Sequence, residues 1–574
     1  MPLVHATAQA KKSFMLRFGS VKESEREVEG NGARSDLDEP LGGKVRLTKR
    51  RALLFTALTA VFIMAIGGAA FAADAKPVFD GVGTAPSDVE VSLNMLWILI
   101  GAMLVIFMQA GFALVETGFT RAKHAAHVVS TNFAIFGLGF VGFFLIGFPL
   151  MFGGGFSYAA FGLDKTIGTG ALLGSGSWVL LWGKGGWALS GMGGLGAKGA
   201  PALVFFLYMV AFMDTVATIP TGSMAERWKW KSFVWWGLFC GAIYYPLFGA
   251  WTWGGGWLSQ LGNSMKLGFG YVDFAGSGVV HAVGGVAALA GAIVLGPRLG
   301  KFGPDGKPRA LGAHSVPMAM LGTFILLFGW FGFNAASTFS ATDVRFAMVA
   351  VNTAVAAAFG ATAAMFYVMK RMGKPDPGMM VNGMLAGLVA ITAPCAFVQP
   401  WAAAVIGVLA AILIVESVLF FERKGIDDPV GAISVHGVGG LFGVLCVGIF
   451  SSGDYGAGWN LTTKGAAAGA SGVTGILYDF DLGSKQLASQ AIGALVICTV
   501  IFGIAYGFFK IQNAMTKGGI RSSAEDEEMG LDIPEMGVLA YDNLVLNELD
   551  LVGAGNQKKV LSGGVSPDES STGR

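Results

Sequence analysis

The chain has 574 residues, of which 53% are hydrophobic and 13% are charged, whereas an ordinary soluble domain carries about 25% charged residues. A soluble globular protein is therefore excluded, and the apolar middle of the chain also excludes intrinsic disorder. Charges concentrate at the two ends, with 17 in residues 1–50 and 17 in residues 510–574. The net charge of +2 argues against a nucleic-acid partner, and four cysteines in apolar runs are too few for a disulfide scaffold.

The first 72 residues predict a targeting segment. Residues 49–51 (Lys-Arg-Arg) precede an apolar run that ends in Ala70-Phe71-Ala72, so we expect residues 49–72 to be a signal peptide that is cleaved after Ala72. An uncleaved helix is the alternative, because the apolar run is long. Residues 1–48 form a polar N-terminal extension, which is either disordered or lies before the true start of the protein.

Eleven apolar segments of roughly membrane-spanning length follow. They predict an all-α membrane domain at residues 89–511, with eleven transmembrane helices near 93–115, 130–152, 200–224, 232–251, 276–297, 315–335, 344–369, 379–396, 401–421, 432–451 and 487–509. Residues 153–199, where Gly, Ser and Lys dilute the apolar pattern, are expected to form an ordered external loop. Residues 512–574 are expected to form a cytoplasmic tail.

Lysine and arginine in the connecting segments predict the orientation of the helices. The segments after predicted helices 1, 3, 5, 7 and 9 carry fourteen of these residues, whereas the much longer segments on the other side carry eight. Because basic residues concentrate in cytoplasmic loops, we expect the mature N-terminus outside and the C-terminus in the cytoplasm. A multi-pass protein of the inner (plasma) membrane is thus predicted.

A motif occurs twice, 155 residues apart. Val280-His281-Ala-Val-Gly-Gly matches Val435-His436-Gly-Val-Gly-Gly, and each histidine follows an aspartate by eight positions. Because five predicted helices separate the copies, the second enters the membrane from the opposite side, which predicts an inverted 5+5 repeat with a substrate path between its halves. Two histidines at matching depth would line that path. The alternatives are two separately satisfied core histidines and a bis-histidine haem site.

Aromatic residues at helical spacing suggest a second element of the site. One predicted helix face carries Trp330, Phe333, Asn334 and Ser337. Tyr208 and Phe212 are spaced i, i+4, and Trp253 precedes three glycines at the external end of a helix. Aromatic faces with a hydroxyl acceptor suit a small cation, although core packing is the more common cause of such a stripe.

Three aspartates lie in or beside the apolar segments. Asp273 is interpreted as the N-cap of a helix, as a carboxylate that helps to recruit or deprotonate a cation, or as both. Asp428 is more simply a helix start, because Pro429 follows it. Asp214 lies within a predicted helix, where an unpaired carboxylate is costly, so we expect it to pair across the bundle or with a neighbouring subunit.

With these residues in hand, the chain resembles the ammonium transporter (Amt/Rh) family, and its bacterial Amt branch, from about residue 89 to 541. The matching segments are Met108-Gln-Ala-Gly-Phe-Ala113, Ala225-Glu-Arg227, Trp253-Gly-Gly-Gly256, Asp273-Phe-Ala-Gly276, Gly329-Trp-Phe-Gly-Phe-Asn334, Asn352-Thr353 and Asp427-Asp-Pro429 through His436-Gly437. The stretch Phe212-Met213-Asp214-Thr215 departs from the family's commonest pattern, in which small residues follow the first phenylalanine.

The resemblance implies a function and assigns residues to it. It implies an ammonium transporter, a homotrimer with one narrow apolar pore per subunit, rather than an enzyme, and no cofactor. The implied external ammonium site comprises Tyr208, Phe212, Trp253 and Ser337, with Asp273 as the carboxylate needed for transport. Phe212 and Phe333 are the implied phenyl gate, and His281 with His436 the twin-histidine pore lining.

The tail has an implied partner and leaves an alternative function open. Residues 530–541 resemble the family's cytoplasmic regulatory segment, which implies contact with a PII-type signalling protein. An ammonium sensor with the same fold is the alternative function. The lack of a kinase, cyclase or other output domain after the last predicted helix favours transport.

Overall fold

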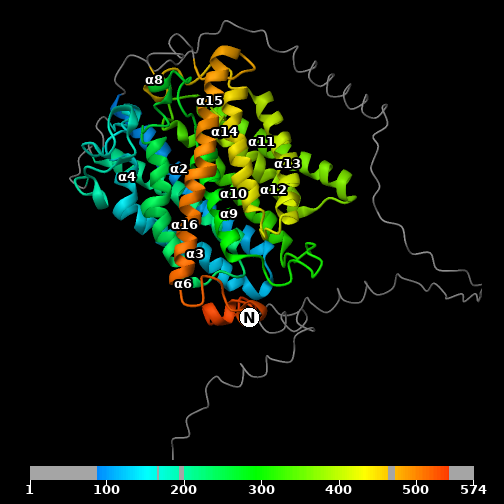
Figure 1. The fold of residues 1–574 in the computed structure, drawn as a ribbon. Coiled ribbons are helices and arrows are strands. Elements are labelled where there is room, and N and C mark those ends of the chain that lie inside the picture. The colour runs from blue at the N-terminus through cyan, green and yellow to red at the C-terminus, as the bar shows by residue number, and fades with distance from the viewer. Residues whose placement is uncertain (1–86, 164–166, 193–198, 463–471, 542–574) are drawn as a thin grey trace, which may run out of the picture. The chain divides into compact units, whose positions relative to one another are not determined.

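Helices make up most of the described chain. The structure is a computed structural model that describes residues 87–163, 167–192, 199–462 and 472–541, so the predicted extension (1–48) and signal peptide (49–72) lie outside the described residues. The helices are α2 (Asp88–Phe119), α3 (Ala125–Gly142), α4 (Phe148–Phe152), α5 (Ala200–Met224), α6 (Trp230–Phe239), α7 (Tyr245–Trp251), α8 (Leu261–Met265), α9 (Val283–Leu295), α10 (Val316–Asn334), α11 (Arg345–Met372), α12 (Pro377–Thr392), α13 (Pro400–Arg423), α14 (Gly439–Phe450), α15 (Phe480–Val496), α16 (Phe502–Met515) and α17 (Ala524–Met529) (Figure 1).

Short π-helical turns extend several of these helices. They are η2 (Phe143–Gly147), η6 (Cys240–Tyr244), η7 (Ser277–Ala282), η9 (Ile433–Val438) and η11 (Ile497–Ile501). With these turns included, ten helices of the described chain are long and apolar enough to cross a membrane. The chain is therefore a multi-pass membrane protein.

The remaining predicted span, 379–396, is a shorter helix than expected. It corresponds to α12, which has 16 residues and ends at Thr392. Pro394 follows two residues later and cannot continue a helix, which explains the early end. Each of the eleven predicted segments thus contains helix, but ten meet the length expected of a span.

Polar capping residues let two helices begin several residues before the apolar runs that predicted them. The first predicted span begins at residue 93, yet α2 begins at Asp88, because Ser87 and Glu90 form a capping box. The last predicted span begins at residue 487, yet α15 begins at Phe480, where the Asp479 carboxylate accepts a hydrogen bond from the third residue of the helix at 2.9 Å. Apolar runs therefore locate the helices but underestimate their length.

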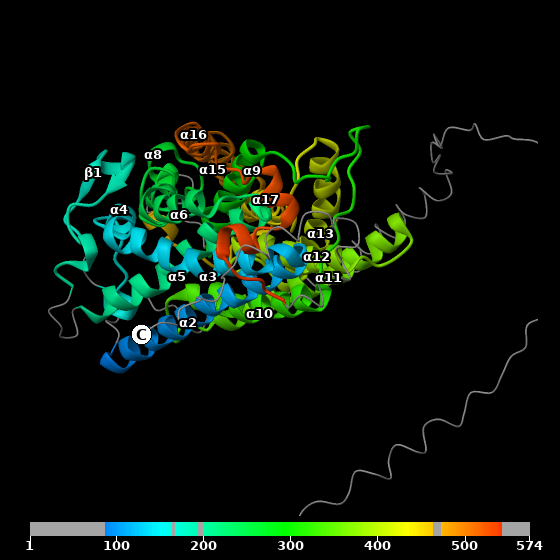
Figure 2. The same cartoon turned by 90° about the horizontal axis from the view of Figure 1, so that it is seen from below.

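The helices divide into central and peripheral ones. The apolar windows of α5 and of η7–α9 are 83% buried, whereas that of α15–α16 is only 28% buried. Between α4 and α5 the chain forms a small antiparallel pair of strands, β1 (Ala171–Leu173) and β2 (Leu181–Trp182). At the other end of the bundle, drawn in red in Figure 1, α17 and the residues after it pack under the helices, and Figure 2 views this face directly. Three of the predicted site residues, Tyr208, Phe212 and His281, lie on these central helices.

Candidate functional site

Two histidines face each other within the bundle. His281 lies in η7 and His436 in η9, and their Nδ1 atoms are 3.1 Å apart. The two rings stack with 5.2 Å between centroids and 25° between planes, and both are buried. A neutral imidazole has one donor and one acceptor nitrogen, so one ring donates to the other. The structure thus brings the two histidines of the repeated motif together.

Bare glycine backbones permit this approach. A Cβ atom on Gly285 would lie 2.1 Å from the backbone nitrogen of Gly437, and one on Gly440 would lie 2.4 Å from the carbonyl oxygen of Ser277. No side chain fits at such distances. The glycines of the repeated motif therefore set the separation of the helices that carry the histidines.

The aspartate eight residues before each histidine caps its turn. The Asp273 carboxylate accepts three hydrogen bonds of 2.8–2.9 Å, from the backbone N–H groups of Gly276, Gly278 and Val279. Asp428 accepts one from the backbone N–H of Ile433 at 2.7 Å. Burial raises the pKa of both carboxyl groups to about 6, although these backbone hydrogen bonds act to lower it. The Asp273 side chain thus caps the first N–H groups of the turn, although Gly276 and not Asp273 occupies the predicted N-cap position.

A row of rings leads from Trp253 to the histidines. Trp253 meets Phe212 edge-on with 5.8 Å between ring centroids, and Phe212 stacks on Phe333 at 4.0 Å. Phe333 in turn stacks on His281 at 5.4 Å. These rings come from α5, α10, η7 and the turn after α7, so the bundle brings together residues that are far apart in sequence. The two phenylalanines of the implied gate form the narrowest contact of the row.

Tyr208 and Ser337 lie beside the Trp253 end of the row. The Tyr208 ring is 4.7 Å from that of Phe212, and its hydroxyl is 3.0 Å from the Ser337 Oγ atom. Ser337 donates its own proton to the carbonyl oxygen of Phe333 at 2.7 Å, so its lone pairs accept hydrogen bonds. The indole N–H of Trp253 donates to the carbonyl oxygen of Asp273 at 2.7 Å. All eight residues implied by the resemblance therefore lie in one connected arrangement.

Trp330 is a further member of this arrangement. Its ring stacks on His281 at 5.0 Å with 16° between planes, and its indole N–H donates to the Thr392 hydroxyl at 2.9 Å. The sequence placed Trp330 in an aromatic stripe without assigning it a role. Its spacing of three residues from Phe333 was the available signal, since both rings then share one helix face.

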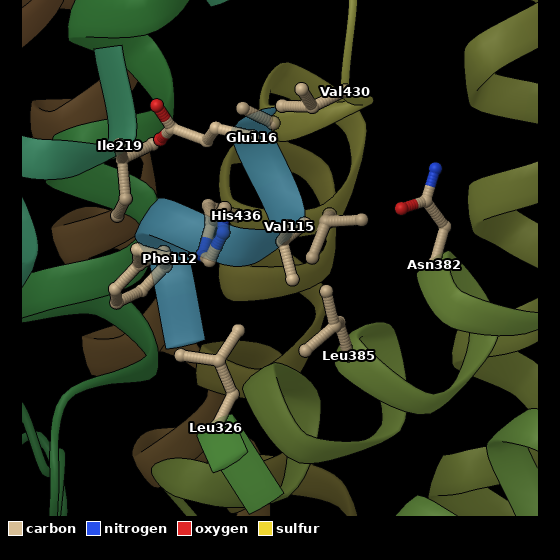
Figure 3. A pocket seen from close by; sticks show the side chains of 11 residues that line it. Phe112, Val115, Glu116, Ile219, Leu326, Asn382, Leu385, Val430 and His436 are labelled. Atoms are coloured by element: carbon tan, nitrogen blue, oxygen red, sulfur yellow. The ribbon is translucent and has the colours of Figure 1, made fainter. Parts of the chain in front are cut away.

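A cavity lies next to His436, and the sequence did not predict it. Figure 3 shows its lining residues, Phe112, Val115, Glu116, Ile219, Leu326, Asn382, Leu385, Val430, Ala432, Val435 and His436. Besides the imidazole, its polar side chains are those of Glu116 and Asn382. Glu116 could have been found as a carboxylate directly after the apolar run 93–115, because α2 continues through it to Phe119.

Comparison with known proteins identifies the family. Residues 96–541 match the model of the Ammonium Transporter Family. The chain belongs to this family. The ammonium transporter Amt2 of Archaeoglobus fulgidus is 43% identical to it over 82% of this chain and 93% of the relative. A putative ammonium transporter of Synechocystis is 34% identical over 79% of this chain and 90% of the relative.

Solved structures support the same family. A structure described as "Sensor Amt Protein" is similar with a TM-score of 0.66 and 34% identity, over 78% of this chain and 99% of that one. The crystal structure of Candida albicans Mep2 is similar with a TM-score of 0.61 and 27% identity, over 76% of this chain and 87% of that one. The family consists of transporters rather than enzymes.

In this ammonium transporter family member, the segment between α4 and α5 supports the Trp253 turn. The indole N–H of Trp251 donates to the carbonyl oxygen of Leu180 at 2.9 Å. Trp257 stacks on Trp178 with 6.2 Å between centroids and 11° between planes. Both contacts flank Trp253, so the segment fixes the backbone that presents this ring.

Buried ion pairs join the helices at the opposite end of the bundle. Arg298 donates to Asp427 at 2.8 Å and to Glu226 at 3.0 Å, and Arg121 donates to Glu226 at 2.6 Å. Burial alone would raise the pKa of Glu226, but Arg298, His124 and Arg121 outweigh it and hold the pKa at about 2. The carboxylate therefore stays ionised and fixes the segments that connect the helices.

The described part of the tail packs against this ion-paired end (Figure 2). Asp532 accepts a hydrogen bond of 2.9 Å from the backbone N–H of His127, near the start of α3. Glu535 accepts one of 3.3 Å from the backbone N–H of Trp230, the first residue of α6. Glu527 accepts one of 2.6 Å from the backbone N–H of Leu299. The tail thus supplies carboxylate caps to two helices of the membrane domain.

Asp214 stands apart from the row of rings. It follows Phe212 by two positions on α5 and therefore points to the other side of the helix, where Cys240 lies near it. It is 3% exposed, and its Oδ1 atom has no hydrogen-bond partner among the described residues. The expected partner across the bundle is thus not found within the described part of the chain.

Proposed function

We propose that this chain transports ammonium by moving ammonia and a proton separately. In the proposal, the ammonium ion is recruited by Trp253, Tyr208, Phe212 and Ser337, where aromatic faces and hydroxyl lone pairs favour a small cation. The observation that carries the proposal is the continuous row of rings from Trp253 to His281. An apolar row of this kind opposes an intact ion, because the transfer of a charge from water into low dielectric costs several kcal/mol or more.

Loss of a proton removes this cost. The ion gives up its proton near Asp273, and neutral ammonia passes between Phe212 and Phe333 to the paired histidines. The proton follows a separate route that includes the two imidazoles, whose Nδ1 atoms are within hydrogen-bond distance. Potassium has no proton to lose and is therefore excluded.

The proposal includes eleven spans in an inverted 5+5 repeat, with the N-terminus outside and the C-terminus in the cytoplasm. Both histidines lie in π-helical turns that an aspartate caps from eight residues upstream, which supports the repeat. The short helix α12 supplies the eleventh span. In this orientation Trp253 and the 153–199 segment lie outside, and the 512–574 tail is a cytoplasmic regulatory region.

Assembly, partner and location are also part of the proposal. We expect a homotrimer in the plasma (inner) membrane, because peripheral helices expose large apolar side chains such as Phe133, Phe324 and Phe366 to lipid or to neighbouring copies. The regulatory tail is the proposed contact for a PII-type protein. Cleavage after Ala72 remains part of this scheme and lies outside the described residues.

An ammonium sensor is the second candidate function. The similarity to the structure described as "Sensor Amt Protein" favours keeping it.

The geometry of the two histidines argues against a bis-histidine haem site and against two separately satisfied core histidines. The Nδ1 atoms of His281 and His436 are 3.1 Å apart and bonded to each other, which leaves no room for a haem iron between them and makes each ring the partner of the other.

Charge movement in proteoliposomes tests the proposal. We expect ammonium to evoke a saturating current in the parent protein, and we expect Asp273→Ala and His281→Ala to abolish most of it. The Asp214→Asn variant, which changes a buried carboxylate away from the row, is the matched control. A parent protein that binds ammonium but shows neither current nor pH-detected ammonia flux would favour the sensor.

A further inference from the structure

The cavity next to His436 contains a buried carboxylate with no cationic partner among the described residues. Glu116 is 3% exposed, and its oxygens accept hydrogen bonds from the Asn132 amide at 2.7 Å and from the Thr221 hydroxyl at 2.8 and 2.9 Å. Both donors are neutral, and no ion pair forms at Glu116 within the described residues. The charged group that acts on it is Asp428, which is also acidic. A carboxylate in such surroundings favours a cation as its neighbour.

A second acceptor lies on another wall of the same cavity. Asn382 is 7% exposed, and its Oδ1 atom is buried without a hydrogen-bond partner among the described residues. Figure 3 shows this oxygen directed toward the interior, with Val115 and Val430 between the two polar walls. An unpartnered buried oxygen is costly, so a hydrogen-bond donor in the cavity would stabilise it.

The cavity continues the row of rings. His436 contacts His281 on one side and Phe112 on the other, with 6.2 Å between the centroids of His436 and Phe112. Both His436 and Phe112 line the cavity that contains Glu116. The path that begins with aromatic rings at Trp253 therefore ends in a space with a carboxylate, an amide oxygen and an imidazole among apolar walls.

We propose that this cavity is a second ammonium-binding site, at the cytoplasmic end of the path, with Glu116 as the carboxylate that holds the ion. An ammonium ion carries four N–H donors and one positive charge, which complement the Glu116 carboxylate, and the unpartnered Asn382 oxygen on the other wall of the cavity is a further acceptor. The outer site holds the ion with rings and hydroxyls, whereas this inner site holds it with a charge. The inference rests on the proposed transport function.

The inner and outer sites can be tested separately, because ammonium can be added to either face of the membrane. Ammonium-evoked currents are measured in right-side-out and in inverted vesicles, for the parent and for Glu116→Gln. In the variant we expect the KM for ammonium at the cytoplasmic face to rise by about tenfold, which corresponds to the loss of one charge-assisted contact. We expect the KM at the outer face to stay within about twofold of the parent, since the outer site is untouched.

Two further variants control for damage to the fold. Asp214→Asn removes another buried carboxylate of the bundle, and we expect it to leave both KM values unchanged. Glu116→Asp keeps the charge on a shorter side chain, and we expect a smaller rise at the cytoplasmic face alone. This variant carries the test if the glutamine variant does not reach the membrane.

The outcomes distinguish the two proposals. A parent protein with neither current nor pH-detected ammonia flux in either vesicle type overturns the transport function, and the inner site with it. A parent current together with Glu116 variants that leave the cytoplasmic KM unchanged, or that shift both KM values equally, overturns the inner site alone.

Discussion

The two copies of the histidine motif have the same local structure in different surroundings. Each histidine lies in a π-helical turn capped by an aspartate eight residues upstream. The residue before the capping aspartate is Val272 in the first copy and Asp427 in the second. Val272 is part of an apolar environment, whereas Asp427 is held by Arg298 in a network of buried ion pairs. The first copy of the motif therefore lies beside aromatic side chains, and the second lies beside buried ion pairs.

In the proposed mechanism, this difference assigns a different step to each end of the path. The first copy lies beside the aromatic row, where an ion would face apolar rings, so it suits the step at which charge must be lost. The second copy lies between the ion-paired segments and the cavity of Glu116, so it suits the step at which a charged species is accepted. The repeat supplies two equivalent imidazoles, and their neighbours make the two ends unequal.

The largest effect on stability is expected from Arg298→Ala, which removes the ion pair beside the second copy of the motif. The variant leaves Glu226 and Asp427 buried without their shared cation, and loss of one partner from a buried ion pair costs about 3–5 kcal/mol. Thermal unfolding in detergent measures it. The control is Arg345→Ala, which removes a partly exposed ion pair with Asp343 and should cost under about 1 kcal/mol. Equal losses in the two variants would contradict the account.

Acid should weaken the same ion-paired region. The pKa of Glu226 is about 2 in the folded chain, below its ordinary value of 4.5, so the folded state favours the ionised form. The resulting stabilisation, about 3 kcal/mol, is complete above pH 4.5 and is lost as the pH falls toward 2. Unfolding temperature measured against pH should show a larger loss in the parent than in Glu226→Gln, where Asp427, whose pKa Arg227 and Arg298 also lower, still titrates. A parent whose stability is flat between about pH 5 and pH 3 would contradict it.

The capping aspartates provide a direct comparison of the two copies. We expect Asp273→Ala to lower ammonium flux by about a hundredfold, or roughly 2.7 kcal/mol, and Asp428→Ala to lower it less. The reason is that Asp273 accepts three backbone hydrogen bonds and lies beside Trp253, whereas Asp428 has one such bond and no ring of the row beside it. Initial flux into proteoliposomes measures both. Equal losses of flux in the two variants would mean that flux depends on the capping hydrogen bonds alone and not on the surroundings of Asp273.

The smallest effect is expected at the tail. Asp532→Ala removes the carboxylate that caps the start of α3 and should cost about 1 kcal/mol. It should also expose residues 516–541 to protease, while ammonium flux through the path persists. Limited proteolysis of the membrane-embedded protein measures this, with Glu525→Ala on the exposed side of α17 as the control. A tail that stays equally protected in both variants would show that Asp532 does not hold it.

The sequence predicted the parts of the site that depend on recurring patterns. The repeated motif made His281 and His436 visible, although its third position differs between the copies, and helical spacing marked Phe333 and Ser337. The positions of the helices followed from apolar runs, because a span must satisfy its backbone internally in lipid. Local features had marked Trp253 and Asp273, and the family resemblance assigned both to one implied ammonium site.

What the sequence could not predict depends on contacts between distant segments. Trp330 gains its contact with His281 only because α10 packs against η7, and Glu116 lines the path only because α2 continues past its apolar run. The tail was expected to be regulatory, yet its caps on α3 and α6 join residues more than 300 positions apart. Contacts between residues so far apart leave no periodic pattern in a single amino-acid sequence.

The central claim is that the row of rings admits ammonia and excludes an intact ion. The most direct test compares currents evoked by ammonium and by potassium in proteoliposomes containing the parent protein or His281→Asp. The account predicts an ammonium current without a potassium current in the parent, and a potassium current in the variant, where a carboxylate replaces an imidazole beside Phe333. A potassium current in the parent, or unchanged potassium exclusion in His281→Asp, would contradict it.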